Sequence, residues 1–223
     1  MALTLVIGNK NYSSWSLRPW LAMSMAGIAF DELRIPLDQP DTKANILRHS
    51  PTGKVPCLLD AGAEGTLTVW DSLAICEYVN ETHASGRMWP AERRARARAR
   101  STAAEMHSGF AALRGQWSMR AADSGLEVPL DAAARADVAR IDAIWADCRA
   151  RGAGGGPWLF GSRYGIADAM YAPVALRFST YGAALSPGAQ AYLEHALADP
   201  HLLDWIRGAR HELAAQGRPA VHP

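Results

Sequence analysis

The stretch from residue 3 to residue 26 constrains the fold of this chain most strongly. Residues 3–7 form a short apolar run that predicts a buried strand. Two adjacent serines, Ser13 and Ser14, follow and open an amphipathic helix, which Gly27 is placed to end. A helix start carries unpaired backbone N–H groups and partial positive charge, so it favours an anion. Either serine can cap this helix, or it can donate a hydrogen bond to a thiolate bound at that end.

The first 82 residues alternate between strand and helix patterns. Turn residues separate the segments, and a loop is expected at residues 50–53. The expected order is strand, helix, strand, helix, strand, strand, helix, at residues 3–7, 13–26, 30–37, 42–48, 54–60, 67–70 and 73–82. This order predicts a small α/β domain, for which the crossover rule allows few topologies.

The second half of the chain has only helical patterns. A linker at residues 83–90 contains glycine and proline, and one long helix is expected from residue 91 to Trp117, with apolar positions stepping by three or four. Further helices are expected at residues 130–151, 165–181, 187–198 and 200–215, with a strong break at 152–157 and a loose tail at 218–223. The predicted fold is therefore an α/β domain (1–82), a linker (83–90) and an all-α domain (91–223).

Charge and composition exclude several classes of function. The formal net charge is +1, which argues against a nucleic-acid-binding protein. The cysteines Cys57, Cys76 and Cys148 are odd in number and far apart, so they predict no disulfide framework. The histidines lack metal-ligand spacing, and His107 is interpreted as a surface or partly buried side chain. No secretory signal or membrane-spanning run is found, and we expect a cytoplasmic protein that binds neither membranes nor metals.

Two further features at expected strand-to-helix junctions are candidate site residues in addition to the serines. Pro56 stands near the start of an expected strand, and a cis bond between Val55 and Pro56 would leave the Val55 backbone free for an extended ligand. Asp71 precedes Ser72, a plausible cap of the next helix. An aspartate suits an ammonium group, and a serine at a helix start suits a carboxylate. Because such junctions gather at one end of a sheet, they describe a site for a small zwitterionic peptide that carries a thiol.

Four motifs give the chain a family resemblance. They are SSWSLR at residues 13–18, GKVP at 53–56, DSLAICEYV at 71–79 and GSRYGIADAMYAPV at 161–174. In this order and spacing they resemble the cytosolic glutathione S-transferases over roughly residues 3–213. The resemblance implies a thioredoxin-like N-terminal domain followed by a helical domain, and transfer of glutathione, as co-substrate, to small electrophiles in detoxification.

The resemblance also implies the role of the serines. Ser13, or else Ser14, would donate a hydrogen bond to the glutathione sulfur and favour its thiolate. The arrangement looks like the serine type, closest to the zeta and related bacterial groups. Trp15, however, stands where the zeta motif has a cysteine, which counts against the zeta-type isomerisation of maleylacetoacetate.

The remaining glutathione contacts follow from the same resemblance. The backbone of Val55, beside a cis Pro56, would pair with the cysteinyl part of the ligand. Asp71 and Ser72 would hold the γ-glutamyl end, with Ser72 on its carboxylate. Lys54 is a weaker candidate for the glycyl carboxylate.

Such proteins are usually homodimers with an apolar second-substrate pocket against the helical domain. In this chain the candidates for that pocket are Trp15, Met106, Phe110 and Arg114, although core packing also explains Met106 and Phe110. Two alternatives to a transferase remain: a non-catalytic glutathione-binding or regulatory module of the same fold, and a glutathione-dependent isomerase.

Overall fold

The computed structural model describes residues 2–151, 155–218 and 220–221. Its N-terminal part holds a four-stranded sheet, with β1 (Ala2–Ile7), β2 (Asp31–Arg34), β3 (Cys57–Gly62) and β4 (Gly65–Trp70) in the order β2-β1-β3-β4. β1 and β2 are parallel, whereas β3 is antiparallel to both β1 and β4. The α/β domain expected from the sequence is thus confirmed, with a shorter second strand and a third strand that starts after Pro56.

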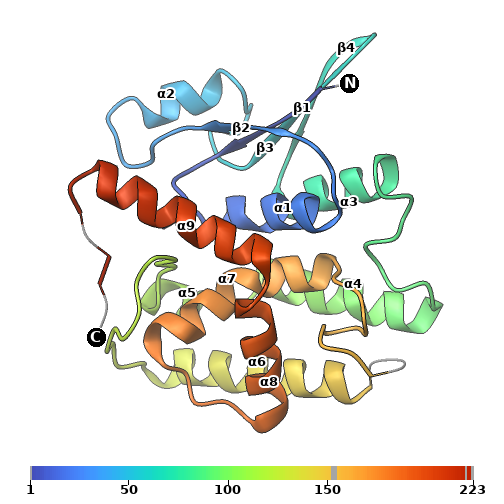
Figure 1. Ribbon diagram of the computed structural model, residues 1–223, viewed down its shortest axis with the longest axis vertical. Coiled ribbons are helices and arrows are strands. Elements are labelled where there is room, and N and C mark those ends of the chain that lie inside the picture. The colour runs from blue at the N-terminus through green and yellow to red at the C-terminus, as the bar shows by residue number, and fades with distance from the viewer. Residues whose placement is uncertain (1, 152–154, 219, 222–223) are drawn as a thin grey trace.

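Three helices cover the two faces of this sheet (Figure 1): α1 (Ser14–Met25), α2 (Thr42–Leu47) and α3 (Ser72–Thr82). Because side chains alternate along a strand, β1 serves both faces. Leu5 and Ile7 face the core that contains α1 and α3, whereas Val6 packs with Ile46 of α2. The centre of the sheet, formed by β1 and the first half of β3, is therefore buried, whereas β2 and β4 at its edges are largely exposed.

The helical domain follows below the sheet in Figure 1. Its elements are α4 (Arg93–Ser108), α5 (Ala111–Gln116), α6 (Ala132–Ala150), α7 (Ile166–Tyr181), α8 (Pro187–Leu197) and α9 (Pro200–Ala215). The described parts of the chain thus form a thioredoxin-like domain followed by an all-helical one, as predicted.

The prediction of a single helix from residue 91 to Trp117 is wrong. α4 ends at Ser108, and α5 starts only after Phe110, whose φ of 59° lies in the left-handed region. Gly109 allows this break, because a Cβ there would lie 2.7 Å from the carbonyl oxygen of Glu105. The apolar spacing continues across the break because both helices pack on the same core, so periodicity alone could not reveal it.

The predicted loose tail is also corrected in part. The Val221 N–H donates to Oδ1 of Asp123 (2.7 Å), and its carbonyl accepts from the Ser124 N–H (2.8 Å). Val221 is therefore fixed to the loop that follows α5. The expected break at 152–157 falls partly on residues 152–154, outside the described residues.

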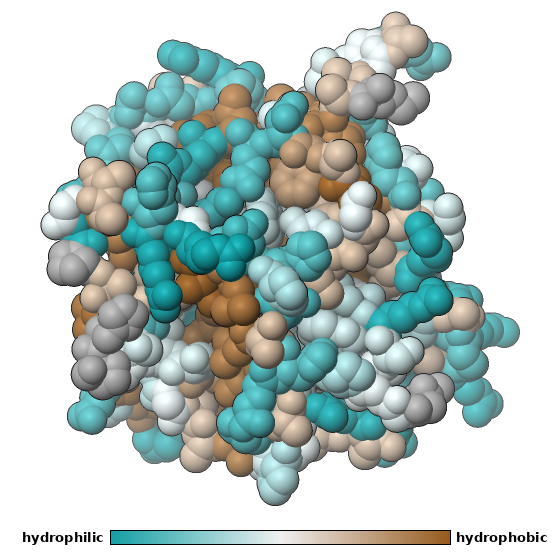
Figure 2. Space-filling model, viewed as in Figure 1, coloured by the Kyte–Doolittle hydropathy of each residue, from teal (hydrophilic) through white to brown (hydrophobic). Residues whose placement is uncertain are grey.

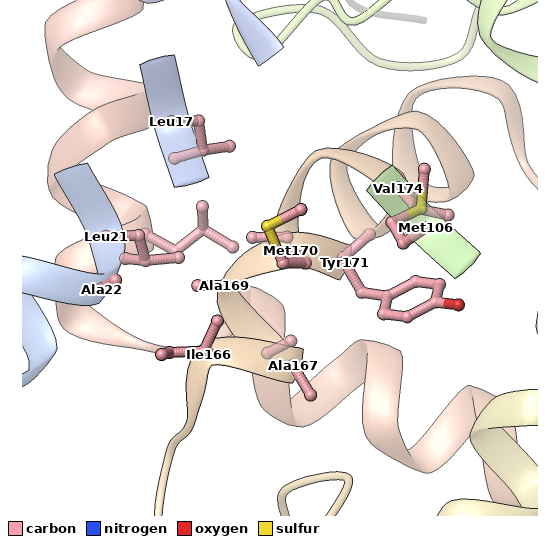
Figure 3. Packing of buried hydrophobic residues seen from close by; sticks show 14 of the residues in the cluster. Leu17, Leu21, Ala22, Met106, Ile166, Ala167, Ala169, Met170, Tyr171 and Val174 are labelled. Atoms are coloured by element: carbon pink, nitrogen blue, oxygen red, sulfur yellow. The ribbon is translucent and has the colours of Figure 1, made fainter. Parts of the chain in front are cut away.

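Packing between α1 and α7 joins the two domains (Figure 3). Leu17 and Leu21 of α1 face Ile166 and Met170 of α7, and all four side chains are buried. Nearly every residue of α7 is buried, as its apolar composition predicts. This continuous core fixes the orientation of α1, whose N-terminus carries the two serines.

A second contact ties α9 to the sheet domain. Nζ of Lys10 lies 4.8 Å from the ring centroid of Trp20 and 5.3 Å from that of Trp205, and it pairs with Glu32 at 2.8 Å. The Trp205 indole donates to the Lys10 carbonyl oxygen (2.8 Å).

Hydrophilic side chains dominate much of the face in Figure 2, with smaller apolar areas in its middle. Within the described ranges, no helix is long and apolar enough to cross a membrane.

Candidate functional site

A cavity of about 540 Å³ brings together residues from three separate segments of the sheet domain and one helix of the helical domain. Its lining includes all five residues predicted to bind glutathione, together with two of the four predicted for a second substrate. The lining residues are Trp15, Thr52, Lys54, Val55, Pro56, Trp70, Asp71, Ser72 and Arg114.

The segment before β3 lines this cavity with Thr52, Lys54, Val55 and Pro56. The peptide bond between Val55 and Pro56 is cis, as hypothesised from the sequence. β3 begins only at Cys57, so Val55 lies outside the strand ladder. An extended backbone at this position can pair with the backbone of a bound peptide.

Asp71, rather than Ser72, caps α3. Its Oδ1 accepts hydrogen bonds from the N–H groups of Leu73 (2.9 Å) and Ala74 (3.2 Å). The φ of Asp71 is 74°, an uncommon value for a residue other than glycine, and it places the carboxylate at the helix start.

Ser72 is the first residue of α3 and is 1% exposed. Its Oγ is buried and has no hydrogen-bond partner. A buried hydroxyl without a partner costs free energy, so the position favours a ligand that accepts its hydrogen bond. A carboxylate is well suited, because the helix start adds partial positive charge.

The two serines of α1 differ in their surroundings. Ser13 is 6% exposed and donates from Oγ to Oγ of Ser16 (2.7 Å), which also accepts the Gly8 N–H (3.1 Å). Ser13 makes no capping hydrogen bond with its side chain, so it is not a simple N-cap. Ser14 is the first residue of α1 and is half-buried. Neither serine lines the cavity itself, although their neighbour Trp15 does.

Trp15 lies between positive charges. The guanidinium carbon of Arg18 is 4.0 Å from its ring centroid, and that of Arg114 is 4.9 Å from it. Arg18 is 1% exposed, and its Nε and Nη1 atoms have no hydrogen-bond partner. Burial, with help from the charges of Arg114 and Arg177, lowers the pKa of Arg18 to about 9. Arg18 therefore keeps its charge at neutral pH and makes this end of α1 attractive to an anion.

Two residues predicted for the second-substrate pocket lie elsewhere. Met106 is fully buried and Phe110 is 7% exposed, and both belong to the main core. Their positions agree with the alternative explanation for their spacing, core packing.

Sequence reasoning missed several residues of the site. Thr52 and Trp70 line the cavity, and Trp70 is 47% exposed at the end of β4. His107 of α4 reaches Asp71, with 3.2 Å between Nε2 and Oδ2. The position of Trp70 directly before Asp71 is a signal that could have identified it. No local pattern reveals His107, because its contact crosses between the domains.

The protein's own thiols are unsuited to chemistry. Cys57, Cys76 and Cys148 are all buried, and burial raises the pKa of each. None of these three buried thiols is therefore suited to act as a thiolate at neutral pH. Among the described residues no group of histidine, cysteine and acidic side chains could hold a metal ion.

A second cavity, of about 520 Å³, lies between the linker and the loop that precedes α7. Its lining contains Trp89, Arg96, Phe160 and Tyr164 but none of the predicted site residues. The five residues predicted to bind glutathione, with Trp15 and Arg114, therefore line the first cavity and not this one.

Comparison with known protein families matches both domains of the chain to one family. Residues 12–82 match the family model for the glutathione S-transferase N-terminal domain, and residues 131–208 match the model for its C-terminal domain. No curated protein sequence matches the chain.

Solved structures share the fold. A glutathione transferase homolog from Burkholderia GL BGR1 with bound glutathione is 22% identical, with a TM-score of 0.68, and covers 95% of this chain and 99% of its own. A family member from Pseudomonas fluorescens pf-5 with two glutathione bound is 20% identical, with a TM-score of 0.67 and 92% of each chain covered. The Tau class enzyme of mango, Mangifera indica L., is 20% identical with a TM-score of 0.69, covering 96% and 98%.

The two models together match about two thirds of the chain, in the order and on the domains that the structure shows. The chain therefore belongs to the glutathione S-transferase family.

Proposed function

We propose that this protein is a glutathione transferase that activates the glutathione thiol for attack on a small, hydrophobic electrophile. One observation carries the proposal: a single cavity is lined by Val55, Pro56, Asp71 and Ser72, which together suit the backbone and the charged γ-glutamyl end of glutathione. A fold of this family has no need of these groups in one cavity unless it binds such a ligand.

Each group of the ligand has a partner in this proposal. The cysteinyl backbone pairs with the backbone of Val55, beside the cis Pro56. The ammonium group binds Asp71, and the γ-glutamyl carboxylate accepts from the unpartnered Ser72 hydroxyl. Lys54, which is exposed on the cavity, pairs with the glycyl carboxylate.

The chemistry depends on the thiolate. A free thiol has a pKa of about 8.5, so little of it is ionised at neutral pH. Lowering that pKa by about two units corresponds to roughly 2.7 kcal/mol of preference for the anion. The hydroxyl of Ser13 or Ser14 donates to the sulfur, and the α1 N-terminus and the Arg18 charge add positive potential there.

The thiolate then attacks an electrophilic carbon of the second substrate. A carbon–sulfur bond forms, and the leaving group departs with the electron pair of the bond that breaks. Trp15 and Arg114, both on the cavity, are the residues placed to contact this substrate. The enzyme only holds the two reactants close together, and it is not itself modified.

The quaternary state and location belong to the same proposal. We propose a cytoplasmic homodimer, and exposed apolar side chains on β4, Leu67 (51% exposed) and Trp70, support a contact between copies. Sedimentation equilibrium tests this: a monomer at micromolar concentration would contradict it.

Turnover with a chromogenic aryl halide tests the function. We expect glutathione to be consumed and a thioether to form, and we expect one of Ser13→Ala and Ser14→Ala to slow turnover by roughly tenfold or more. Isomerisation without net consumption of glutathione would identify an isomerase instead. Retention on immobilised glutathione without turnover of any electrophile would identify a binding module.

A further inference from the structure

We propose that Glu212, on α9 of the helical domain, is a positioning residue that sets the geometry of the serines at the start of α1. It acts through one peptide group of the serine loop, residues 8–13, which leads from β1 into α1. The inference rests on the proposed function, because it concerns how a serine hydroxyl is aimed at the glutathione sulfur. It adds to thiol activation a residue that does not line the cavity.

The peptide group between Asn9 and Lys10 joins α9 to the end of the serine loop. Its N–H, which belongs to Lys10, donates to Oε2 of Glu212 at 2.9 Å. Its carbonyl, which belongs to Asn9, accepts from the N–H groups of Ser13 (2.9 Å) and Tyr12 (3.2 Å). A peptide group is planar, so fixing the direction of its N–H also fixes the direction of its carbonyl. The position of Ser13 therefore depends on the hydrogen bond that Glu212 accepts.

Ser14 depends on the same peptide group through Tyr12. The Ser14 N–H donates to the carbonyl oxygen of Tyr12 at 3.0 Å, and the Tyr12 N–H is bound to Asn9. A hydrogen bond weakens steeply when its donor is misaligned. A shift of the serine loop would therefore weaken the hydrogen bond to the sulfur, whichever serine makes it.

The charge and burial of Glu212 strengthen its hold on the loop. Glu212 is 6% exposed, and its other oxygen, Oε1, pairs with Nη1 of Arg34 at 3.0 Å. A hydrogen bond to a carboxylate is stronger than one between neutral groups. The carboxylate also polarises the peptide group, which makes the Asn9 carbonyl a better acceptor for the Ser13 N–H.

Two further residues of α9 hold Lys10. The Trp205 indole donates to its carbonyl oxygen at 2.8 Å, so both backbone polar groups of Lys10 bind α9. The Lys10 side chain lies against Gly208, where a Cβ would be only 2.6 Å from Cδ of the lysine. Residues 205, 208 and 212 are three and four positions apart, so they share one face of the helix. This face of α9 therefore fixes the serine loop at Lys10.

The ultraviolet thiolate band of bound glutathione, followed against pH, tests the inference. Glu212→Met removes the acceptor and keeps a side chain of similar length. We expect the midpoint of the band to rise by about half to one pH unit, which is roughly a three- to tenfold loss of thiolate below the midpoint. Turnover should fall by the same factor at low pH and approach the native rate above both midpoints. The KM for glutathione should change little, because the residues proposed to hold this ligand are untouched.

Two control variants separate positioning from stability. Glu212→Gln keeps one oxygen for the buried Lys10 N–H, because the 44% exposed Arg34 can turn toward solvent, so its midpoint should stay close to the native value. Arg34→Met removes the ion pair and leaves the hydrogen bond, so it should lower stability without moving the midpoint. A midpoint in either control as high as in Glu212→Met overturns the inference.

A further variant leaves Glu212 in place. Trp205→Phe keeps an aromatic ring and removes the indole N–H that donates to Lys10, so we expect its midpoint to rise as well. An unchanged midpoint in Glu212→Met, or in Trp205→Phe where Glu212→Met does not fold, overturns the inference and leaves the proposed function standing. A native protein in which glutathione shows no thiolate band overturns both.

Discussion

Arg18 lies directly against Trp15, with its guanidinium carbon 4.0 Å from the ring centroid and two of its nitrogens buried without hydrogen-bond partners. A buried cation without a carboxylate partner destabilises a folded protein. The charge lies beside the cavity in which the proposal places a thiolate. Stability and function are therefore expected to oppose each other at this residue.

Arg18→Met is expected to stabilise the protein and weaken catalysis. The folded-state pKa of about 9 is below the ordinary value for arginine, because folding disfavours the charged form. The resulting loss of stability is absent at high pH, where the group is neutral, and is complete once the pH has fallen below about 9. At pH 7 the full cost of the buried charge is present. Removing it should raise the free energy of unfolding by about 1–3 kcal/mol, and turnover with glutathione should fall.

Denaturant unfolding at pH 7, with turnover measured on the same samples, checks this expectation. Arg207→Met is the matched control, because Arg207 is 66% exposed and pairs with the exposed Asp204, so it should change neither quantity. Loss of stability in Arg18→Met would contradict the assignment of Arg18 as an unpaired charge.

Ser72→Ala is expected to weaken glutathione binding while leaving the fold intact. Its hydroxyl has no partner in the structure, so its removal relieves a buried polar group and should not lower stability. A lost hydrogen bond to a charged carboxylate should raise the KM for glutathione by roughly ten- to a hundredfold. Steady-state kinetics check this, with the exposed Ser101→Ala as control; an unchanged KM would show that Ser72 does not contact the ligand.

Asp168→Asn is expected to destabilise the helical domain in a pH-dependent manner. The carboxylate accepts the N–H groups of Leu159 (3.0 Å) and Gly165 (2.9 Å), and an asparagine can accept only one of them with its single oxygen. We expect a loss of about 1–3 kcal/mol in the free energy of unfolding.

The pH dependence has a definite sign. Burial raises the folded-state pKa of Asp168 from 3.8 to about 6, so its favourable contribution is complete below pH 3.8 and is lost as the pH rises through about 6. The difference between native protein and Asp168→Asn should therefore be larger at pH 4.5 than at pH 7.5. Unfolding at both pH values checks this, with the exposed Asp204→Asn as control; a difference that grows with pH would contradict it.

Local patterns in the sequence were sufficient for the sheet domain. The apolar run of β1, the apolar faces of α1 and α3, and the turn residues between them are short-range signals, and the structure has these elements in the expected order. The break at Gly109 and Phe110 could not be predicted, because the apolar spacing of α4 and α5 continues through it. The position of Val221 depends on Asp123, about a hundred residues earlier.

Some residues of the site could be predicted from the sequence, and others could not. Val55 and Pro56 lie just before β3, whereas Asp71 and Ser72 lie where β4 passes into α3. The antiparallel pairing of Cys57 with Trp70 brings the start of β3 beside the end of β4, so these residues meet in one cavity. Arg18 and His107 act through contacts across the fold. The burial of Arg18 and the approach of His107 on α4 to Asp71 cannot be read from the neighbouring residues in the sequence. Met106 lies in the main core and does not line the cavity, a distinction that the sequence does not reveal because core and pocket residues share the same apolar spacing.

Activation of the thiol is the central claim, and the ultraviolet difference spectrum of bound glutathione, titrated with pH, tests it most directly. We predict a thiolate band that persists well below pH 8 in the native protein and is lost in either Ser13→Ala or Ser14→Ala, which identifies the serine that donates to the sulfur. Bound glutathione without a thiolate band at neutral pH would contradict the account.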